Sequence, residues 1–305
     1  MPIVPSLIMS EFPDFDEPGF DIDKYNKRFY NNNVLIRASA RAVEYPLHWS
    51  PLSVKCSFNG EEYYETRQSR YSVDDEHFLV FNNGRTYSSW IDSHTEVHSL
   101  TLNIAPDFEQ MALRSIKYSA VHQLDDPFDD TVNEYLFTER LYAHGSLVTP
   151  VIHKISGSSQ DELDPLFYEL MEHLLALQEK TKLDVERIDK IKASTRKEIF
   201  ERLQRAKDYI HSCYRDDLSI DEMSNVACMN SFYFLRQFRK AFRITPHQLL
   251  IERRISVANR LLQTTDLSVT EICNDVGFSD LSSFGKLFRR RYGLAPSDLR
   301  MYMRS

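Results

Sequence analysis

The sequence predicts an α+β protein in which an N-terminal antiparallel β-barrel with added helices precedes an all-α part containing two helix-turn-helix units. Three observations support this fold class: short strands broken by turns, a reversal of charge along the chain, and an internal repeat near the C-terminus. The length of 305 residues fits two domains, because single cores seldom grow beyond about 250–300 residues.

Short β-strands separated by turn residues dominate the chain between about residues 34 and 104. Asn59-Gly60 is a strong hairpin signal between two such runs, and Asn83-Gly84 marks a second turn. Evenly spaced strands of this kind favour an antiparallel sandwich or barrel. We also expect short helices over 107–115 and 130–143. The strand-like runs are 52–58, 61–67, 77–83 and 97–104.

A polar stretch at 154–164 is expected to be the loop that ends the β-rich part. Leucines then recur every three or four residues, which predicts an amphipathic helix. This stripe either pairs two subunits or packs on its own barrel, and the sequence favours neither. Its members are Leu163, Leu166, Leu170, Leu174 and Leu177. The expected divisions are therefore 1–160, 161–195 and 196–305.

Charge is distributed unevenly along the chain, whose net charge is −8. Residues 196–305 hold 19 Lys and Arg against 13 Asp and Glu, whereas residues 1–195 hold 18 against 32. This asymmetry indicates that the C-terminal part meets a polyanion and that the N-terminal part does not.

The strongest signal is a repeat inside residues 196–305. The run 218–223 recurs at 267–272, an offset of 49, and each copy reads as a capping box. Aromatic, basic and proline positions further along recur at an offset of 50, so the extra residue is expected in the turn of the second unit. Asn230 and Asp280 are expected to cap the second helix of each copy.

In each second helix, phenylalanines four residues apart predict one buried face and one basic face. Such a helix suits entry into the major groove of DNA. A long helix over 246–262, started by Thr245-Pro246, is expected to connect the two copies.

Here the sequence resembles the AraC/XylS family of regulators over roughly residues 197–303. It departs from the family pattern at Cys228, where a turn glycine is common, and at Arg243, which replaces the glycine after the recognition helix. The matching residues are Pro246-x-x-Leu249-Leu250-x3-Arg254-Ile255-x2-Ala258-x2-Leu261-Leu262, Leu267-Ser268-x2-Glu271-Ile272, Val276-Gly277-Phe278-Ser279, Phe284-x3-Phe288-Arg289 and Gly293-x2-Pro296-x2-Leu299-Arg300.

The resemblance implies double-stranded DNA as the partner and assigns roles to exposed residues of both recognition helices. Arg236 or Lys286 would donate to guanine, and Phe232 would contact a thymine methyl group. The base-reading positions are Ser231, Phe232, Leu235 and Arg236 in the first helix, and Leu281, Ser282, Gly285 and Lys286 in the second. The phosphate-binding positions are Arg239, Lys240, Arg243, Arg289 and Arg290.

For the N-terminal part, the resemblance implies a cupin-like barrel that holds a small effector, with helices that form a homodimer. A protein-interaction domain without a ligand, and a cupin-type metalloenzyme, are the alternatives. RNA polymerase is a further partner to consider. Aromatic residues that would line a pocket, or form plain core, are Tyr45, Trp49, Phe58, Tyr63, Phe81, Tyr87 and Trp90.

Several classes of chemistry are not expected. The four cysteines are too scattered for a disulfide framework or a zinc site, and His94 and His98 alone do not make the cupin metal signature. No phosphate loop or nucleophile elbow occurs, so we expect no catalytic residue, no metal and no cofactor. The N-terminus does not resemble a signal peptide and no long apolar run occurs, which predicts a cytoplasmic protein away from membranes.

Overall fold

The computed structural model describes residues 4–11, 17–117, 135–185 and 193–304, and it divides into two compact units. The first comprises Met1–Gln68 and Ser72–Leu183, and the second comprises Ser69–Tyr71 and Asp184–Ser305. The first is rich in β-structure and the second is helical, which agrees with the predicted α+β class.

An eight-stranded sheet forms the first unit, in the order β1-β2-β7-β3-β6-β8, with β4 paired to β5 and β7. β1 runs parallel to β2, while the other pairs given by register are antiparallel. The long strands β2 and β7 carry most of the pairing. The strands are β1 (Ser6–Met9), β2 (Asn33–Ser50), β3 (Leu52–Phe58), β4 (Glu62–Glu65), β5 (Arg70–Val73), β6 (His77–Phe81), β7 (Arg85–Ile104) and β8 (Leu141–Ala143).

The turn at Asn59-Gly60 is present, but the predicted hairpin across it is wrong. Asn59 adopts a left-handed conformation with φ 62°, as a turn requires. However, β3 and β4 do not pair with each other, because both lie against β7, β3 at 98–104 and β4 at 88–90. Asn59 is tied to β7 as well, since its side-chain amide donates to the carbonyl of Glu96 at 2.9 Å.

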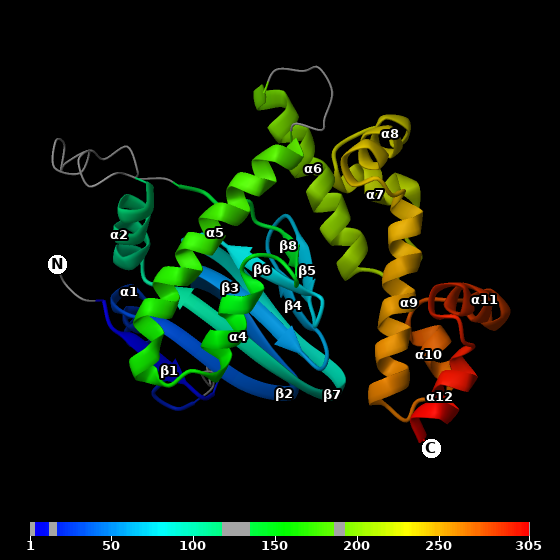
Figure 1. Ribbon diagram of the computed structural model, residues 1–305, viewed down its shortest axis with the longest axis horizontal. Coiled ribbons are helices and arrows are strands. Elements are labelled where there is room, and N and C mark those ends of the chain that lie inside the picture. Colours follow the sequence, from blue (N-terminus) through cyan, green and yellow to red (C-terminus); the bar gives the residue numbers. More distant parts are fainter. Residues whose placement is uncertain (1–3, 12–16, 118–134, 186–192, 305) are drawn as a thin grey trace. The chain divides into compact units, whose positions relative to one another are not determined.

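Three helices, α2 (Pro106–Lys117), α4 (Thr149–Gly157) and α5 (Leu163–Val185), supply apolar residues to the core that covers one face of the sheet. α4 and α5 are seen crossing the strands in Figure 1. α2 confirms the helix expected over 107–115. The helix expected over 130–143 is wrong in its described part, which holds β8, while 130–134 lie outside the described residues.

The leucine stripe of α5 lies in this core. Leu163, Leu170, Leu174 and Leu177 are buried, and Leu166 packs against the same cluster while partly exposed. By its contacts, α5 belongs with the sheet rather than to a separate segment at 161–195. The polar stretch 154–164 is not wholly a loop, because α4 continues through Gly157.

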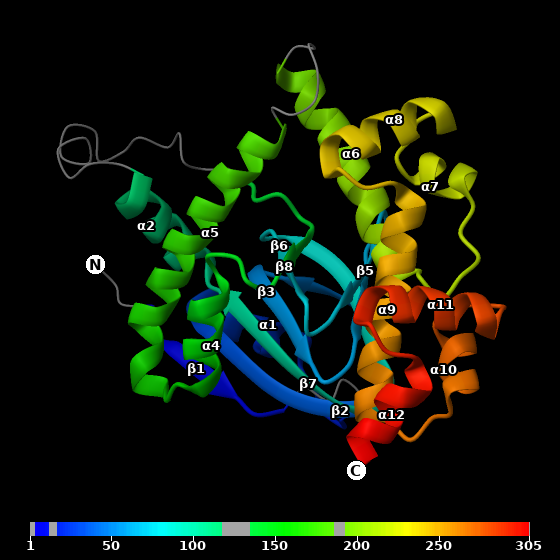
Figure 2. The ribbon, with the colours of Figure 1, turned by 45° about the vertical axis from the view of Figure 1, so that its right-hand side comes forward.

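The second unit is built around the long helix α9 (Pro246–Thr264). The pairs α7–α8 and α10–α11 flank it, with α6 and α12 also packed against it (Figure 2). These helices confirm the expected repeat and the connector that begins at Pro246. Their bounds are α6 (Ala193–Ser212), α7 (Ile220–Val226), α8 (Ser231–Phe242), α10 (Val269–Asp275), α11 (Leu281–Tyr292) and α12 (Pro296–Arg304).

Glu109, near the start of α2, should make stability depend on pH. Burial raises the pKa of its carboxyl group from 4.5 to about 7, so the folded protein favours the protonated form. The resulting destabilisation is absent below pH 4.5 and grows as the pH rises towards 7. We expect Glu109→Gln to stabilise the protein by up to about 2 kcal/mol at pH 8 and hardly at pH 4.5.

Melting curves across this pH range check the Glu109 prediction, with the exposed Glu172→Gln as the control. Equal gains for Glu109→Gln at both pH values would contradict it.

Two glycines of the second unit should respond in opposite ways to alanine. Gly277 has φ +87°, and an added Cβ would lie 2.7 Å from the carbonyl oxygen of Arg215. Gly285 lies inside α11, where an added Cβ meets no atom within 4 Å. Gly277→Ala should therefore lower the free energy of unfolding by about 1–3 kcal/mol, and Gly285→Ala should raise it by about 0.5–1 kcal/mol.

Denaturant titration of the two variants measures both changes. A loss of stability in Gly285→Ala equal to that in Gly277→Ala would show that backbone conformation and crowding do not explain the difference.

Candidate nucleic-acid interface

Each helix-turn-helix copy begins with the predicted capping box. The hydroxyl of Ser219 accepts from the backbone N–H of Glu222 at 3.2 Å, and the Glu222 carboxylate accepts from the backbone N–H of Ser219 at 2.7 Å. Ser268 and Glu271 repeat both bonds with the same lengths. These hydrogen bonds lower the pKa of both glutamates and fix where α7 and α10 start.

The second helix of each copy is capped and anchored as predicted. Asn230 accepts from the backbone N–H of Tyr233, and Asp280 accepts from those of Ser282 and Ser283. The inner faces of α8 and α11 carry fully buried phenylalanine pairs with ring centres 5.3 and 5.8 Å apart. These pairs are Phe234 with Phe238 and Phe284 with Phe288. Their burial turns the remaining face of each helix outwards.

The outer face of α8 presents three of its four predicted base-reading residues to solvent. Phe232 is 78% exposed, which is costly for a large apolar ring and typical of a contact surface. Leu235 and Arg236 are exposed as well, and the Arg236 guanidinium lies 5.5 Å from the centre of the Tyr233 ring. Ser231 differs, because its hydroxyl is engaged with Asp221 Oδ1 at 2.6 Å.

The outer face of α11 is flatter. Leu281, Ser282 and Lys286 are exposed, and Gly285 adds no side chain between them. Only Lys286 among these carries a charge that reaches beyond the helix surface. The described geometry is therefore compatible with the expectation that this helix reads fewer bases than α8.

Basic residues surround both outer faces. The predicted phosphate-binding residues Arg239, Arg243, Arg289 and Arg290 are exposed, and Lys240 is partly exposed. The structure adds Arg291, an exposed residue in the last turn of α11 that the sequence analysis did not select. Arg291 is equivalent in the repeat to Ala241, which is buried. A basic residue at a position that is buried in the other copy could have drawn attention to Arg291 from the sequence.

The two departures from the family pattern fall at left-handed backbone positions. Cys228 has φ 51° where the second copy has Gly277, and Arg243 has φ 61° where the second copy has Gly293. The same turns therefore form in both copies, with conformational strain at the non-glycine residues. The extra residue of the second copy lies between Phe278 and Asp280, in the turn before α11, as predicted.

A buried arginine of α9 joins parts of the unit that are distant in sequence. Arg254 donates from Nε to the carbonyl of Tyr214 at 2.7 Å and from Nη2 to that of Asp216 at 2.8 Å. Its guanidinium also lies 5.5 Å from the centre of the Phe278 ring, in the turn of the second copy. This contact set holds the chain after α6 and the second turn against the same point of α9.

The first unit contains a cavity lined by aromatic residues together with polar and charged ones. Of the aromatic residues considered for a pocket, Tyr45, Trp49 and Tyr87 line it, whereas Phe58, Tyr63, Phe81 and Trp90 do not. The sequence analysis missed Lys55 and Glu62, both buried at this cavity. A signal was present, since 52–58 and 99–104 alternate strictly between polar and apolar residues.

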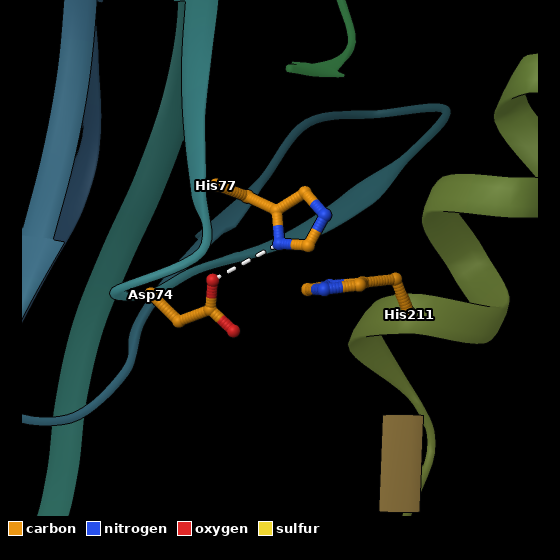
Figure 3. A group of neighbouring side chains, drawn as sticks. All are labelled: Asp74, His77 and His211. Atoms are coloured by element: carbon orange, nitrogen blue, oxygen red, sulfur yellow. Dashed lines mark hydrogen bonds and ion pairs between the residues drawn. The ribbon is translucent and has the colours of Figure 1, made fainter. Parts of the chain in front are cut away.

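The histidines considered for a metal do not converge. His94 and His98 are exposed, and His98 Nδ1 lies 2.8 Å from the hydroxyl of Ser39. His48 lines the cavity, where burial lowers its pKa to about 4. Figure 3 shows the His77–Asp74 pair, 3.1 Å apart at the start of β6. Within either unit taken alone, no group of three His, Cys, Asp or Glu side chains among the described residues lies close enough together to bind a metal ion.

Residues 223–302 match a protein family described as a helix-turn-helix domain. LumQ, a probable transcriptional regulator of Photobacterium leiognathi, is 31% identical over 97 residues, which are 32% of this chain and 39% of LumQ. The DNA-binding domain of AdpA, solved with a target DNA, is 30% identical over 35% of this chain and 92% of that chain, with a TM-score of 0.30. A probable AraC family regulator from Rhodopseudomonas palustris is 21% identical over 33% of this chain and 96% of that one, with a TM-score of 0.32.

The family match defines the class of residues 223–302, which form a helix-turn-helix domain. More narrowly, the resemblance of this part to regulators of the AraC/XylS family, stated from the sequence, is confirmed. The relatives are named as transcriptional regulators and not as enzymes, in agreement with the prediction. The chain spans less than half the length of the curated relatives that it matches. Among the described helices, none is long and apolar enough to cross a membrane.

Proposed function

We propose that the protein is a sequence-specific DNA-binding transcription regulator that places α8 and α11 in two successive major grooves. The observation that carries this proposal is the duplication itself: two capped, aromatic-anchored helices expose side chains outwards and share the connector α9. Successive major grooves on one side of B-DNA are about 34 Å apart, which suits two equivalent helices on a rigid connector.

The exposed residues divide into two roles in this proposal. Phe232, Leu235 and Arg236 of α8 contact base edges, together with Ser231, while α11 contributes Leu281, Ser282, Gly285 and Lys286. Arg236 is the main reader of guanine, because a guanidinium donates to both O6 and N7. The phosphate contacts come from Arg239, Lys240, Arg243, Arg289 and Arg290, to which we add Arg291.

The first unit is proposed to sense a small-molecule effector, with the sheet curved into a cupin-like barrel. Its polar cavity supports this role over that of a protein-interaction platform, since a docking domain needs no buried charge. The metalloenzyme alternative has less support, because His94 and His98 face solvent. The proposal places the protein in the cytoplasm with its operator DNA and includes contact with RNA polymerase if it activates transcription.

The homodimer stays a prediction, but the leucine stripe needs a different reading. Four of its five members are buried in the first unit, so charged substitutions at Leu170 or Leu174 would disrupt the core rather than a subunit contact. A dimer through α5 would use its exposed side, which includes Glu172 and Ala176. We expect sedimentation to show a dimer that Ala176→Arg weakens and that Lys27→Ala, an exposed position outside α5, leaves intact. A monomer at all concentrations would contradict the dimer.

The first measurement is binding of the full chain to genomic DNA fragments across a salt series. Arg236→Ala should lose about 1–3 kcal/mol on selected fragments only, because it removes a base contact. Arg239→Ala is the matched control, since loss of a phosphate contact should weaken all fragments alike and reduce the salt dependence. Equal binding to every fragment, unchanged in Arg236→Ala, would contradict sequence-specific recognition.

A further inference from the structure

One face of the sheet in the first unit is polar and yet buried. In β3 and β7, Ser53 lies opposite Asn103, Lys55 opposite Thr101, and Ser57 opposite Ser99. All six are at most 4% exposed. A polar strand face normally meets water, because buried polar groups without partners are costly. The intervening apolar residues face the helices, so the polar face must line the interior.

That interior holds the cavity already described, which has a volume of about 50 Å³ and opens to solvent. Lys55 and Thr101 line it from the polar face, and Glu62 and Tyr64 line it from β4. Phe29 of α1 (Ile22–Asn31) lines it as well and packs with Ile36 of β2. The polar face is therefore enclosed by α1 and by the neighbouring strands β2 and β4, with the cavity between them.

Two opposite charges border this space, and each acts on the other electrostatically. Lys55 is 3% exposed, and none of the described residues accepts a hydrogen bond from its Nζ, which lies 5.0 Å from the Tyr87 ring centre. Glu62 is 2% exposed, and its Oε2 has no hydrogen-bond partner among the described residues. Burial is the largest influence on both groups, lowering the pKa of Lys55 to about 7 and raising that of Glu62. Each charge is therefore poorly solvated.

The remaining wall is rich in aromatic rings. Tyr25, Tyr45, Trp49 and Tyr87 all line the cavity. Aromatic side chains favour contact with planar rings, through offset stacking or edge-to-face packing. The cavity thus combines one ammonium group, one carboxylate group and an aromatic wall.

We propose that the effector is a small zwitterion carrying a planar ring, whose carboxylate pairs with Lys55 and whose ammonium pairs with Glu62. This inference rests on the proposed effector-sensing role of the first unit. A ligand with both charges gives each buried group a partner and keeps the cavity neutral. A carboxylic acid alone would add a second negative charge near Glu62, and an amine alone would add a second positive charge near Lys55. An uncompensated charge in a buried site is strongly unfavourable.

The test uses the full chain and three sets of matched probes. These are phenylalanine, tyrosine and tryptophan, their deaminated acids, and their decarboxylated amines, each added at millimolar concentration in thermal melting. We expect at least one amino acid to raise the melting temperature by several degrees and its acid and amine to have little effect, because only binding to the folded state stabilises it. Equal shifts for the amino acid and its acid, or no shift with any amino acid, would overturn the proposal.

Two variants separate binding from folding. Lys55→Met should lower the affinity for the amino acid at least tenfold. The variant should then bind the amine and the amino acid equally well, since the ligand's carboxylate no longer has a partner. Glu62→Gln should likewise lose its preference for the amino acid over the acid. Lys180→Met and Glu172→Gln, at exposed positions of α5, are the controls and should bind like the original chain. A tenfold loss without these changes of preference would overturn the assigned pairing.

The outcomes also distinguish this inference from the proposed function. If the full chain selects DNA fragments and acids bind as well as zwitterions, effector sensing stands and the ligand class is wrong. If it selects DNA fragments and no probe binds, the zwitterion proposal fails and the DNA-binding function stands. If it selects no fragments but binds an amino acid with the expected variant behaviour, the site stands and the regulator function fails.

Discussion

The arrangement of the two helix-turn-helix units depends on how α9 is held by its buried arginines. Arg254 donates to the carbonyls of Tyr214 and Asp216 and packs against Phe278. It therefore holds both the segment that leads into the first copy and the turn of the second copy against one point of α9. Arg253 adds a bond from Nε to the carbonyl of His211 at 3.3 Å. Carbonyl groups at the end of α6 need donors, and a rigid guanidinium satisfies two at once. These contacts hold α9 against both copies, as the proposed contact with two successive major grooves requires.

Within each copy, the same division of labour follows from residue type. Phenylalanines on the inner face bury α8 and α11, and capping residues fix where the helices begin, so the outer residues need contribute nothing to folding. The outer face of α8 therefore tolerates an exposed Phe232, while that of α11 tolerates Gly285. The left-handed backbone conformation of Cys228 and Arg243 is unfavourable for non-glycine residues. It persists because packing of the surrounding core holds both turns in place.

The first unit divides its sheet between two tasks. One face is apolar and is covered by α2, α4 and α5, and the leucine stripe belongs to that core. The other face is polar and lines a cavity with the buried groups Lys55 and Glu62, whose removal from water costs stability. A fold that carries such groups gives up stability at the site, and sites of this kind are where proteins bind ligands.

The sequence by itself determined the second unit, because its signals are local: capping boxes, helix-starting proline, turn positions and phenylalanines four residues apart each act within one or two turns. In the first unit it also indicated β3, β4, β6 and the end of β7. Tertiary structure decided what is set by long-range pairing. Asn59-Gly60 turns the chain, but β7 captures both neighbouring strands. The leucine stripe of α5 is equally apolar in a core or an interface, and only the sheet beneath it decides. Lys55 looks like a solvent-facing residue of an alternating strand, and only a helix folded over that face makes it a buried charge.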